Sequence, residues 1–361
     1  MSLAGIRRQS QRWLRAIVPA ILAACLPSVA AAFCGGGFAS EDLTVACLTR
    51  QFETADDEAS RAAAAGLLIS RLVARGHSSA LGFGEGPGWT HVGRTAEPVL
   101  RYDENVNEGS PEGPLVLDGL AFEIPEDQVR QPDLVLGGRV TVAARRILGK
   151  DTWIDLQGGA MLAYAATEHV ALKDVSLDAC LRRGTGPRSS LRACASGAYR
   201  GRKLQDDRAA ILSVEHIRTG VIASRPVLVS FGIRRRFLED HSENGLLAGA
   251  EAIVAPDLVI GLAGAINAPV AGENVERRSL TVFAAGQVGR MKGRVYLRHG
   301  ESSGSNVLGI DRRDETQMIG LTTVLPRGLL LDVSYRRRRG TIAYFDEAEP
   351  HIGIRFAGYR F

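Results

Sequence analysis

Residues 329–361 read LLLDVSYRRRRGTIAYFDEAEPHIGIRFAGYRF and decide the fold class of this 361-residue chain. The first part alternates between apolar and mostly polar residues, which is the period-two pattern of a strand with one apolar face. The apolar positions are Leu329, Leu331, Val333 and Tyr335. The chain ends on Phe361, two residues after Tyr359, as do terminal strands that the barrel assembly machinery inserts into an outer membrane. The stretch therefore predicts the last two strands of an outer-membrane β-barrel.

The end of this stretch changes phase once. One phase holds Ile352, Ile354 and Phe356, and the other holds Tyr359 and Phe361. A β-bulge adds one residue to one strand of a pair and so restores the alternation. We therefore expect a bulge near residues 357–358, because Arg355 would otherwise face lipid.

The composition fits strands better than membrane helices. Hydrophobic residues make up 45% of the chain, yet no apolar run beyond the first thirty residues has the length of a membrane-spanning helix. The 41 glycines favour many turns and close strand contacts. The net charge of +4 comes from arginines spread over strand ends and polar phases, so we expect no nucleic-acid partner.

The N-terminus predicts an export signal over residues 1–32. A basic region that contains Arg7, Arg8, Arg12 and Arg15 precedes an apolar core at 16–24, and three alanines at 30–32 form a cleavage site. A competing interpretation is a lipobox at 22–25, which would make Cys25 a lipidated first residue. We favour removal by a signal peptidase, since a barrel already has a membrane anchor.

From residue 98 onward, period-two alternation gives about fourteen candidate strands. The clearest are 136–145, 154–164, 227–237, 258–266, 280–288, 294–299 and 319–325. With the C-terminus in the periplasm, the short connections are periplasmic: 148–151, 255–257, 290–293 and 326–328. The longer ones are extracellular: 105–133, 238–245, 267–278, 301–315 and 339–350, while 183–190 and 218–226 are long periplasmic exceptions. We therefore predict an all-β fold, a transmembrane antiparallel outer-membrane β-barrel of about 14 strands, over residues 98–361.

Four cysteines follow the export signal, and an even number in an exported protein favours disulfides. Cys180 and Cys194 fall on adjacent candidate strands, in the phase opposite to the apolar residues, so they face one side and can bridge. A pair between Cys34 and Cys47 is expected on the even count. No C-x-x-C pair and no histidine at ligand spacing accompanies them, so we predict no metal site.

Residues 33–97 predict a short helical periplasmic segment and a glycine-rich linker. A helix pattern starts at Thr54 and stops at Gly76. Its apolar positions are Ala59, Ala63, Leu67, Leu68 and Leu72. We expect a plug or linker in preference to a binding module. The glycines at 82–93 have no helix behind them to hold a phosphate, so we expect no nucleotide cofactor.

Three segments resemble the barrel portion of the surface lipoprotein assembly modifier family: DENVNEG at 103–109, RRDETQMIGL at 312–321, and GLLLDVSYRRRRGTIAYFDEAEPHIGIRF at 328–356. The resemblance rests mainly on the last two hairpins. The resemblance implies a fourteen-stranded barrel that helps to move a lipoprotein client across the outer membrane. Members of that family also carry a periplasmic array of tetratricopeptide helices. The region before the barrel is too short for three such repeats, so the resemblance implies the barrel more strongly than the translocation.

Catalytic patterns are poor, and we expect no enzyme. Residues 300–304 match G-x-S-x-G but open a connection between strands, whereas that motif needs a strand-turn-helix elbow. Residues 103–107 are similar to the start of a calcium loop, but the sixth position is Glu108 and the twelfth is Pro114. A loose surface cation site stays open there.

The polar phases of the strands predict the lining of the lumen. The candidate lumen-lining residues are Arg234, Arg236, Arg294, Arg298, Glu215 and Glu251. The connection at 107–133 is the best candidate to fold into or over this lumen, because its 115–129 portion is too apolar for a free surface loop. Two functions stay open: a barrel that assists transport or surface display of a lipoprotein, and a passive or structural porin-like barrel. The expected partners are outer-membrane lipids, the barrel assembly machinery at the terminal strand, and a lipoprotein client for the first function.

Overall fold

The structure is a computed structural model. It describes residues 34, 39–54, 63–65, 67–68, 71, 89–111, 113–117, 120–186, 188–255, 257–288, 291–307, 309–325, 329–356 and 359–360. The expected export signal, Cys25, Phe361 and most of the helix expected at 54–76 lie outside these residues.

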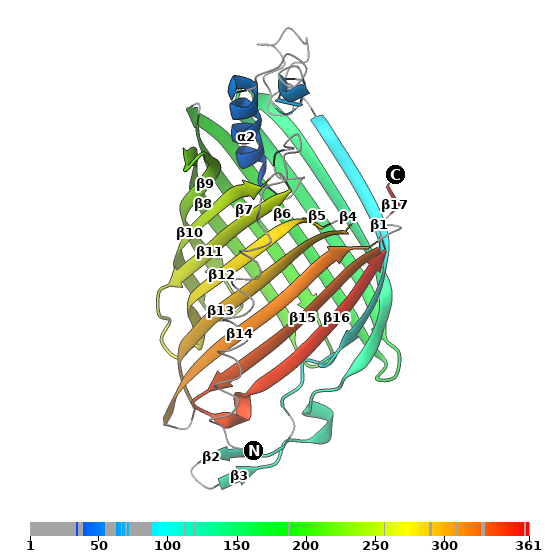
Figure 1. Cartoon of the computed structure of the whole chain (residues 1–361). Coiled ribbons are helices and arrows are strands. Elements are labelled where there is room, and N and C mark those ends of the chain that lie inside the picture. Colours follow the sequence, from blue (N-terminus) through cyan, green and yellow to red (C-terminus); the bar gives the residue numbers. More distant parts are fainter. Residues whose placement is uncertain are drawn as a thin grey trace.

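The chain forms a closed antiparallel β-barrel of 14 strands (Figure 1). These strands are β1 (Trp89–Asp103), β4 (Asp133–Gly149), β5 (Thr152–Ala165), β6 (Val170–Gly186), β7 (Ser189–Gly201), β8 (Asp206–Ile222), β9 (Arg225–Phe237), β10 (Ser242–Ala255), β11 (Leu258–Asn267), β12 (Val275–Val288), β13 (Met291–Val307), β14 (Ile310–Val324), β15 (Leu329–Gly340) and β16 (Glu347–Phe356). Each strand from β4 to β16 pairs with its sequence neighbour, and β1 pairs with both β4 and β16, which closes the sheet. No described helix is long and apolar enough to cross a membrane.

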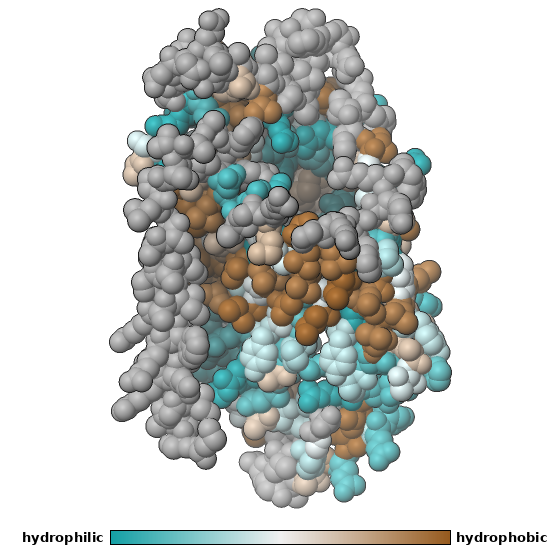
Figure 2. All heavy atoms as spheres, turned by 45° about the vertical axis from the view of Figure 1, so that its right-hand side comes forward, coloured by the Kyte–Doolittle hydropathy of each residue, from teal (hydrophilic) through white to brown (hydrophobic). Residues whose placement is uncertain are grey.

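Side chains alternate between the two faces of the wall. On β5, Leu162 is 67% exposed on the outer face, whereas Trp153 and Met161 are buried on the inner face. This arrangement follows from period-two alternation, which places Leu162 in the phase opposite to Trp153 and Met161. Figure 2 shows the result as a brown apolar band across the middle of the molecule, with hydrophilic residues beyond it. An outward apolar band around a closed polar barrel defines a protein of the outer membrane.

The predicted bulge lies at the closing seam. β16 pairs with β1 so that Arg355 faces Val99, whereas β17 (Tyr359–Arg360) pairs with the same strand so that Tyr359 faces Ala96. An uninterrupted register would place residue 358 opposite Ala96, so the terminal strand carries one extra residue between these pairs. The shift keeps Arg355 in register with Val99, on the inner face.

The two ends of the barrel are distinguished by the connections. At the end that holds Tyr359, the strands are joined by 150–151, 187–188, 223–224, 256–257, 289–290 and 325–328. All are short, as periplasmic turns are, and the opposite end carries the long connection 104–132. We therefore assign the first end to the periplasm.

Three expected connections and one boundary were wrong. The expected periplasmic loops at 183–190 and 218–226 are tight turns, because β6 and β8 each continue to the turn. The expected extracellular loop at 301–315 is mostly strand, because β13 and β14 run on to a turn at 308–309. These extensions lack the apolar alternation used to predict strands, because the parts of a strand that project beyond the lipid need no apolar face. The barrel also starts at Trp89 and not at residue 98, so 89–93 are strand and not linker.

Smaller elements occupy both ends. The helix α2 (Glu41–Thr54) lies at the periplasmic end, at the top of Figure 1. The long extracellular connection carries a hairpin of β2 (Leu115–Leu117) and β3 (Leu120–Phe122) and the short helix η3 (Glu126–Gln128). A second short helix, η5 (Ala343–Phe345), joins β15 to β16. The hairpin projects from the barrel and Phe122 is exposed, so this part of the connection does not fold into the lumen.

Candidate functional site: the lumen and its occluding helix

The helix α2 starts with a strong set of local signals. Ser40 precedes the first turn and its hydroxyl accepts a bond from the amide of Leu43 at 3.4 Å. Glu41 and Asp42 fill the first turn, where the helix dipole favours negative charge. These same carboxylates point to the barrel wall.

Two arginines of the inner wall bind the start of α2. The guanidinium of Arg145, on β4, donates to both carboxylate oxygens of Glu41 at 3.0 and 2.9 Å, which is the strong bidentate geometry. Arg182, on β6, lies 3.5 Å from Asp42. The amide of Ser40 donates to Glu251 of β10 at 3.3 Å. The helix start is therefore held from three strands.

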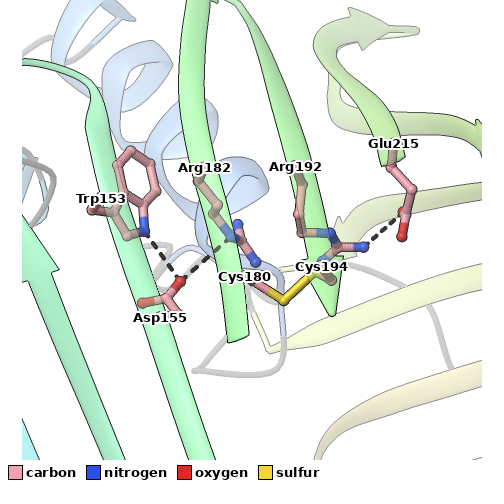
Figure 3. Close-up of a disulfide and its surroundings, with 7 residues drawn as sticks. All are labelled: Trp153, Asp155, Cys180, Arg182, Arg192, Cys194 and Glu215. Carbon is pink, nitrogen blue, oxygen red and sulfur yellow. Dashed lines mark hydrogen bonds and ion pairs between the residues drawn. A yellow bond between two sulfur atoms is a disulfide. The ribbon is translucent and has the colours of Figure 1, made fainter. Parts of the chain in front are cut away.

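The wall beneath these contacts is a continuous polar platform (Figure 3). Asp155 accepts from Arg145 at 2.5 Å and from the indole of Trp153 at 3.1 Å, and it lies 3.5 Å from Arg182. The disulfide between Cys180 and Cys194 lies beside Arg182 and joins directly paired residues of β6 and β7. Contacts with Asp155 therefore position both arginines on the wall, independently of the helix.

Apolar residues of α2 pack on β8 to β11. Leu43 and Leu48 are buried against Leu228 and Ile253, in a cluster that also includes Cys47, Ile217 and Val259. Burying each leucine contributes about 2 kcal/mol. Phe283 borders this cluster, and its ring lies over Gly261, where a larger side chain would overlap it.

A disulfide also fastens the helix internally. Cys34 and Cys47 are bonded, so the segment before α2 is tied to the second turn of the helix. The element that occupies the periplasmic end of the lumen is thus a cross-linked unit, bound to the wall by ion pairs and by apolar contacts.

At the extracellular end, residues 105–109 fold onto the inner wall. Val106 and Asn107 are fully buried, and Val106 packs among apolar residues of β4 to β6 such as Val135 and Met161. The amide of Asn107 donates to the carbonyl of Val129 at 2.8 Å, and its side-chain oxygen accepts from the backbone of Gln131 at 2.9 Å. The start of the connection therefore lies on the inner wall, whereas the prediction rested on the apolar 115–129 portion, whose hairpin projects from the barrel.

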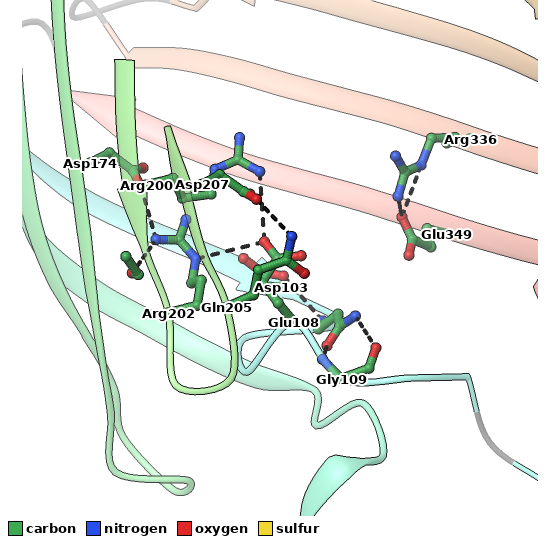
Figure 4. Close-up of polar contacts among 12 residues, drawn as sticks. Asp103, Glu108, Gly109, Asp174, Arg200, Arg202, Gln205, Asp207, Arg336 and Glu349 are labelled. Atoms are coloured by element: carbon green, nitrogen blue, oxygen red, sulfur yellow. Dashed lines mark hydrogen bonds and ion pairs between the residues drawn. The ribbon is translucent and has the colours of Figure 1, made fainter. Parts of the chain in front are cut away.

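Charged groups face each other around this segment (Figure 4). Glu108 lies 3.6 Å from Arg200 and 4.0 Å from Arg202, and Arg202 also binds Asp174 at 2.8 Å. Burial raises the pKa of the Glu108 carboxyl, although the two arginines oppose this change. The carboxyl is therefore easier to protonate than a free glutamate.

A second ionic cluster lies on β15 and β16. Arg336 binds Glu349, and Arg338 lies 3.0 Å from Glu347. In Figure 4 the Arg336–Glu349 pair lies apart from the Glu108 cluster. The extracellular half of the lumen therefore has ion pairs on two parts of its wall.

The six residues predicted to line the lumen all lie in the inward phase, but they contact other residues and not each other. Glu215 binds Arg192 at 2.7 Å, and Arg298 binds Glu276 at 2.7 Å. Arg236 lies 3.7 Å from Glu243, and Arg234 donates to Asn267 at 3.1 Å. Arg294 stacks on Phe283 at 4.1 Å, and Glu251 receives the helix start.

Sequence reasoning missed the most specific contacts. It expected a helical segment within 33–97 but started the helix at Thr54, where α2 ends, although Ser40 followed by two acidic residues is a helix-start signal. It also left out Arg145 and Arg182, which are in the same inward phase as predicted lumen residues. Their partners come from a segment more than ninety positions away, so only the fold brings them together.

Comparisons with known proteins give a fold likeness and no family. No protein-family model matches the chain, and no curated protein matches it. Among solved structures, Pseudomonas aeruginosa OpdK with vanillate gives a TM-score of 0.40 at 8% identity, over 75% of this chain and 98% of that one. Pseudomonas aeruginosa OprD gives 0.39 at 11% identity, over 76% and 95% of the two chains. Pseudomonas putida OprB gives 0.41 at 8% identity, over 76% and 94%.

The strand register and the contacts in the lumen define the class of protein. The chain is an outer-membrane β-barrel with an ionic inner face and a helix in the periplasmic end of its lumen.

Proposed function

We propose that the barrel is a porin-like conduit for small hydrophilic solutes, with α2 as its plug. The observation that supports this proposal is the lining: inward arginines are paired with inward carboxylates along the wall, at both ends of the lumen. Paired charges make a wall that water and polar solutes can wet, whereas a lipid path needs apolar walls.

The contacts of α2 give this conduit a way to open. The plug is held by noncovalent contacts with the wall, and its ionic contacts reach β4, β6 and β10. Each of these charge-assisted contacts contributes only about 2 kcal/mol. The plug can therefore leave its seat at a lower free-energy cost than that of unfolding the wall.

The test is conductance of the purified full chain in planar bilayers, together with the matched variant Glu41→Gln/Asp42→Asn. We expect larger or more frequent openings in the variant, because both wall arginines lose their partners on α2. Thr49→Val is the control, since the Thr49 hydroxyl binds only the carbonyl of Val45 within the same helix. A folded variant and a folded wild type that both fail to conduct would contradict the proposal.

A second candidate is surface display of a lipoprotein, and it rests on the resemblance of residues 312–321 and 328–356. These residues form β14 to β16, which carry the Arg336 and Arg338 cluster. Deleting the gene would then lower the protease accessibility of a surface lipoprotein on intact cells without lowering its total amount. Unchanged accessibility of surface lipoproteins, with reduced uptake of small solutes, would favour the conduit.

A further inference from the structure

The outer face of β12 to β15 changes from apolar to charged over three cross-strand rows. The first row is Val282, Leu297, Ile319 and Tyr335. The second row, nearer the extracellular end, is Leu280, His299, Gln317 and Arg337. The third is Arg278, Glu301, Glu315 and Arg339. This sequence of rows marks the level at which the acyl chains of the outer leaflet end and the lipid headgroups begin.

Two hollows lie on the outer face of the wall. The first has a volume of about 370 Å³ and opens between large outward side chains, where Ala248 and Gly264 leave space. Its edge toward the headgroup level is formed by Arg278 and His299. The second, of about 1020 Å³, shares Leu246 and Ile266 with the first and reaches Arg235, and it extends across the outer face of β8 to β5 as far as Ile154, near a periplasmic turn. Two adjoining apolar hollows match a lipid with several acyl chains.

Arginines lie at the hollows and beside them: Arg278 lines the first hollow and Arg235 the second, whereas Arg337 and Arg339 lie outside both hollows, on β15. We call Arg235, Arg278, Arg337 and Arg339 the arginine edge. Four arginines here face two outward carboxylates, Glu301 and Glu315, so positive charge is in excess. Arg278 pairs with Glu301 at 2.6 Å but is still 67% exposed. Glu301 and Glu315 are directly paired across β13 and β14. The imidazole of His299 contacts both carboxylates, at 3.4 Å from Glu301 and 3.6 Å from Glu315.

We propose that the two hollows and the arginine edge bind lipid A, the phosphorylated and multiply acylated glucosamine lipid of the outer leaflet. Its acyl chains lie in the hollows and its phosphates meet the arginines, whose guanidinium groups suit phosphate oxygens. A second copy of the chain fits this surface less well, because a symmetric contact would bring the same cations together. The proposal does not depend on whether the lumen conducts.

The experiment measures lipid retention by native mass spectrometry of the full chain in detergent. The probes are lipid A with both phosphates, the same lipid with one phosphate removed, and phosphatidylethanolamine. We expect the bisphosphorylated lipid to be retained most. Arg278→Gln/Arg339→Gln should lower its apparent affinity about tenfold, which is a loss of two charge-assisted contacts.

Two matched variants separate the charge from the hollow. Arg183→Gln/Arg218→Gln removes two exposed outward arginines next to the periplasmic turns and should leave lipid A retention unchanged. Ala248→Leu fills the first hollow and should weaken all lipid A forms equally, so the preference for the second phosphate stays. Equal retention of phosphatidylethanolamine and lipid A, an equal loss in the periplasmic control, or a dimer that excludes lipid from this face would each overturn the proposal. Each variant is first shown to resist SDS before heating, so that unfolding is not taken for lost affinity.

Discussion

At the scale of single residues, Arg145 joins the plug to the wall, because it binds Glu41 and Asp155 together. Arg145→Gln should weaken docking of α2 by about 2 kcal/mol, as expected for lost hydrogen bonds between charged groups. The check is the rate of trypsin cleavage after Arg50 in the folded protein, which should rise. Arg139→Gln, on the same face of β4 and bonded to Met161, should leave that rate unchanged. Equal rates in the two variants would show that Arg145 does not hold the plug.

Glu108 predicts a pH dependence at the extracellular end. Burial raises its pKa, so the folded segment binds a proton that the free segment would release. Docking of residues 105–109 is therefore strongest at a pH below the ordinary glutamate pKa. It weakens as the pH rises through the raised pKa of Glu108. Hydrogen exchange at the Val106 amide, which donates to Gln131 at 2.9 Å, should accelerate over this range. Glu108→Gln should remove the dependence, whereas Glu126→Gln in the exposed η3 should keep it.

Predictions for single residues succeeded where they depended only on the strand face to which a side chain belongs. They failed where they depended on which residue that side chain binds. The phase of β5 and the inward direction of Arg234 or Glu215 follow from period-two alternation alone. Which carboxylate each arginine binds depends on strand register and on α2, and alternation contains neither.

At the scale of elements, the disulfide between Cys34 and Cys47 should control the plug and not the wall. Cys34→Ser/Cys47→Ser opens a loop of 13 residues, for which chain entropy gives about 3 kcal/mol. We expect faster proteolysis of α2 and more frequent channel openings, with the same heat-induced shift in gel mobility. Cys180→Ser/Cys194→Ser is the comparison, since it removes a bond within the paired strands β6 and β7. Loss of the gel shift in Cys34→Ser/Cys47→Ser would show that the plug is needed for the stability of the barrel wall.

Among the elements, the membrane-spanning strands were predictable and the rest were less so. The apolar phase that lipid requires identified strands such as β5 and β9, but it stops where the strands leave the membrane. The polar ends of β6, β8, β13 and β14 were therefore taken for loops. The position of α2 was missed because its sequence is nearly balanced between polar and apolar residues, and its burial comes from the wall around it.

At the scale of the whole molecule, we expect the terminal strand to have two roles, closure of the sheet and recognition by the assembly machinery, that a truncation can separate. Closure rests on four residue pairs between β1 and β16 and on two more through β17. Deleting residues 359–361 removes the smaller set, so the purified chain should still refold in detergent to an SDS-resistant form that shifts on boiling. In cells, the same deletion should sharply lower the folded fraction, because the aromatic end that the assembly machinery receives is gone. The measurement is the ratio of folded to unfolded bands in unheated membranes and after refolding. Equal losses in both settings would show that these residues only close the sheet, and no loss in cells would show that assembly does not depend on them.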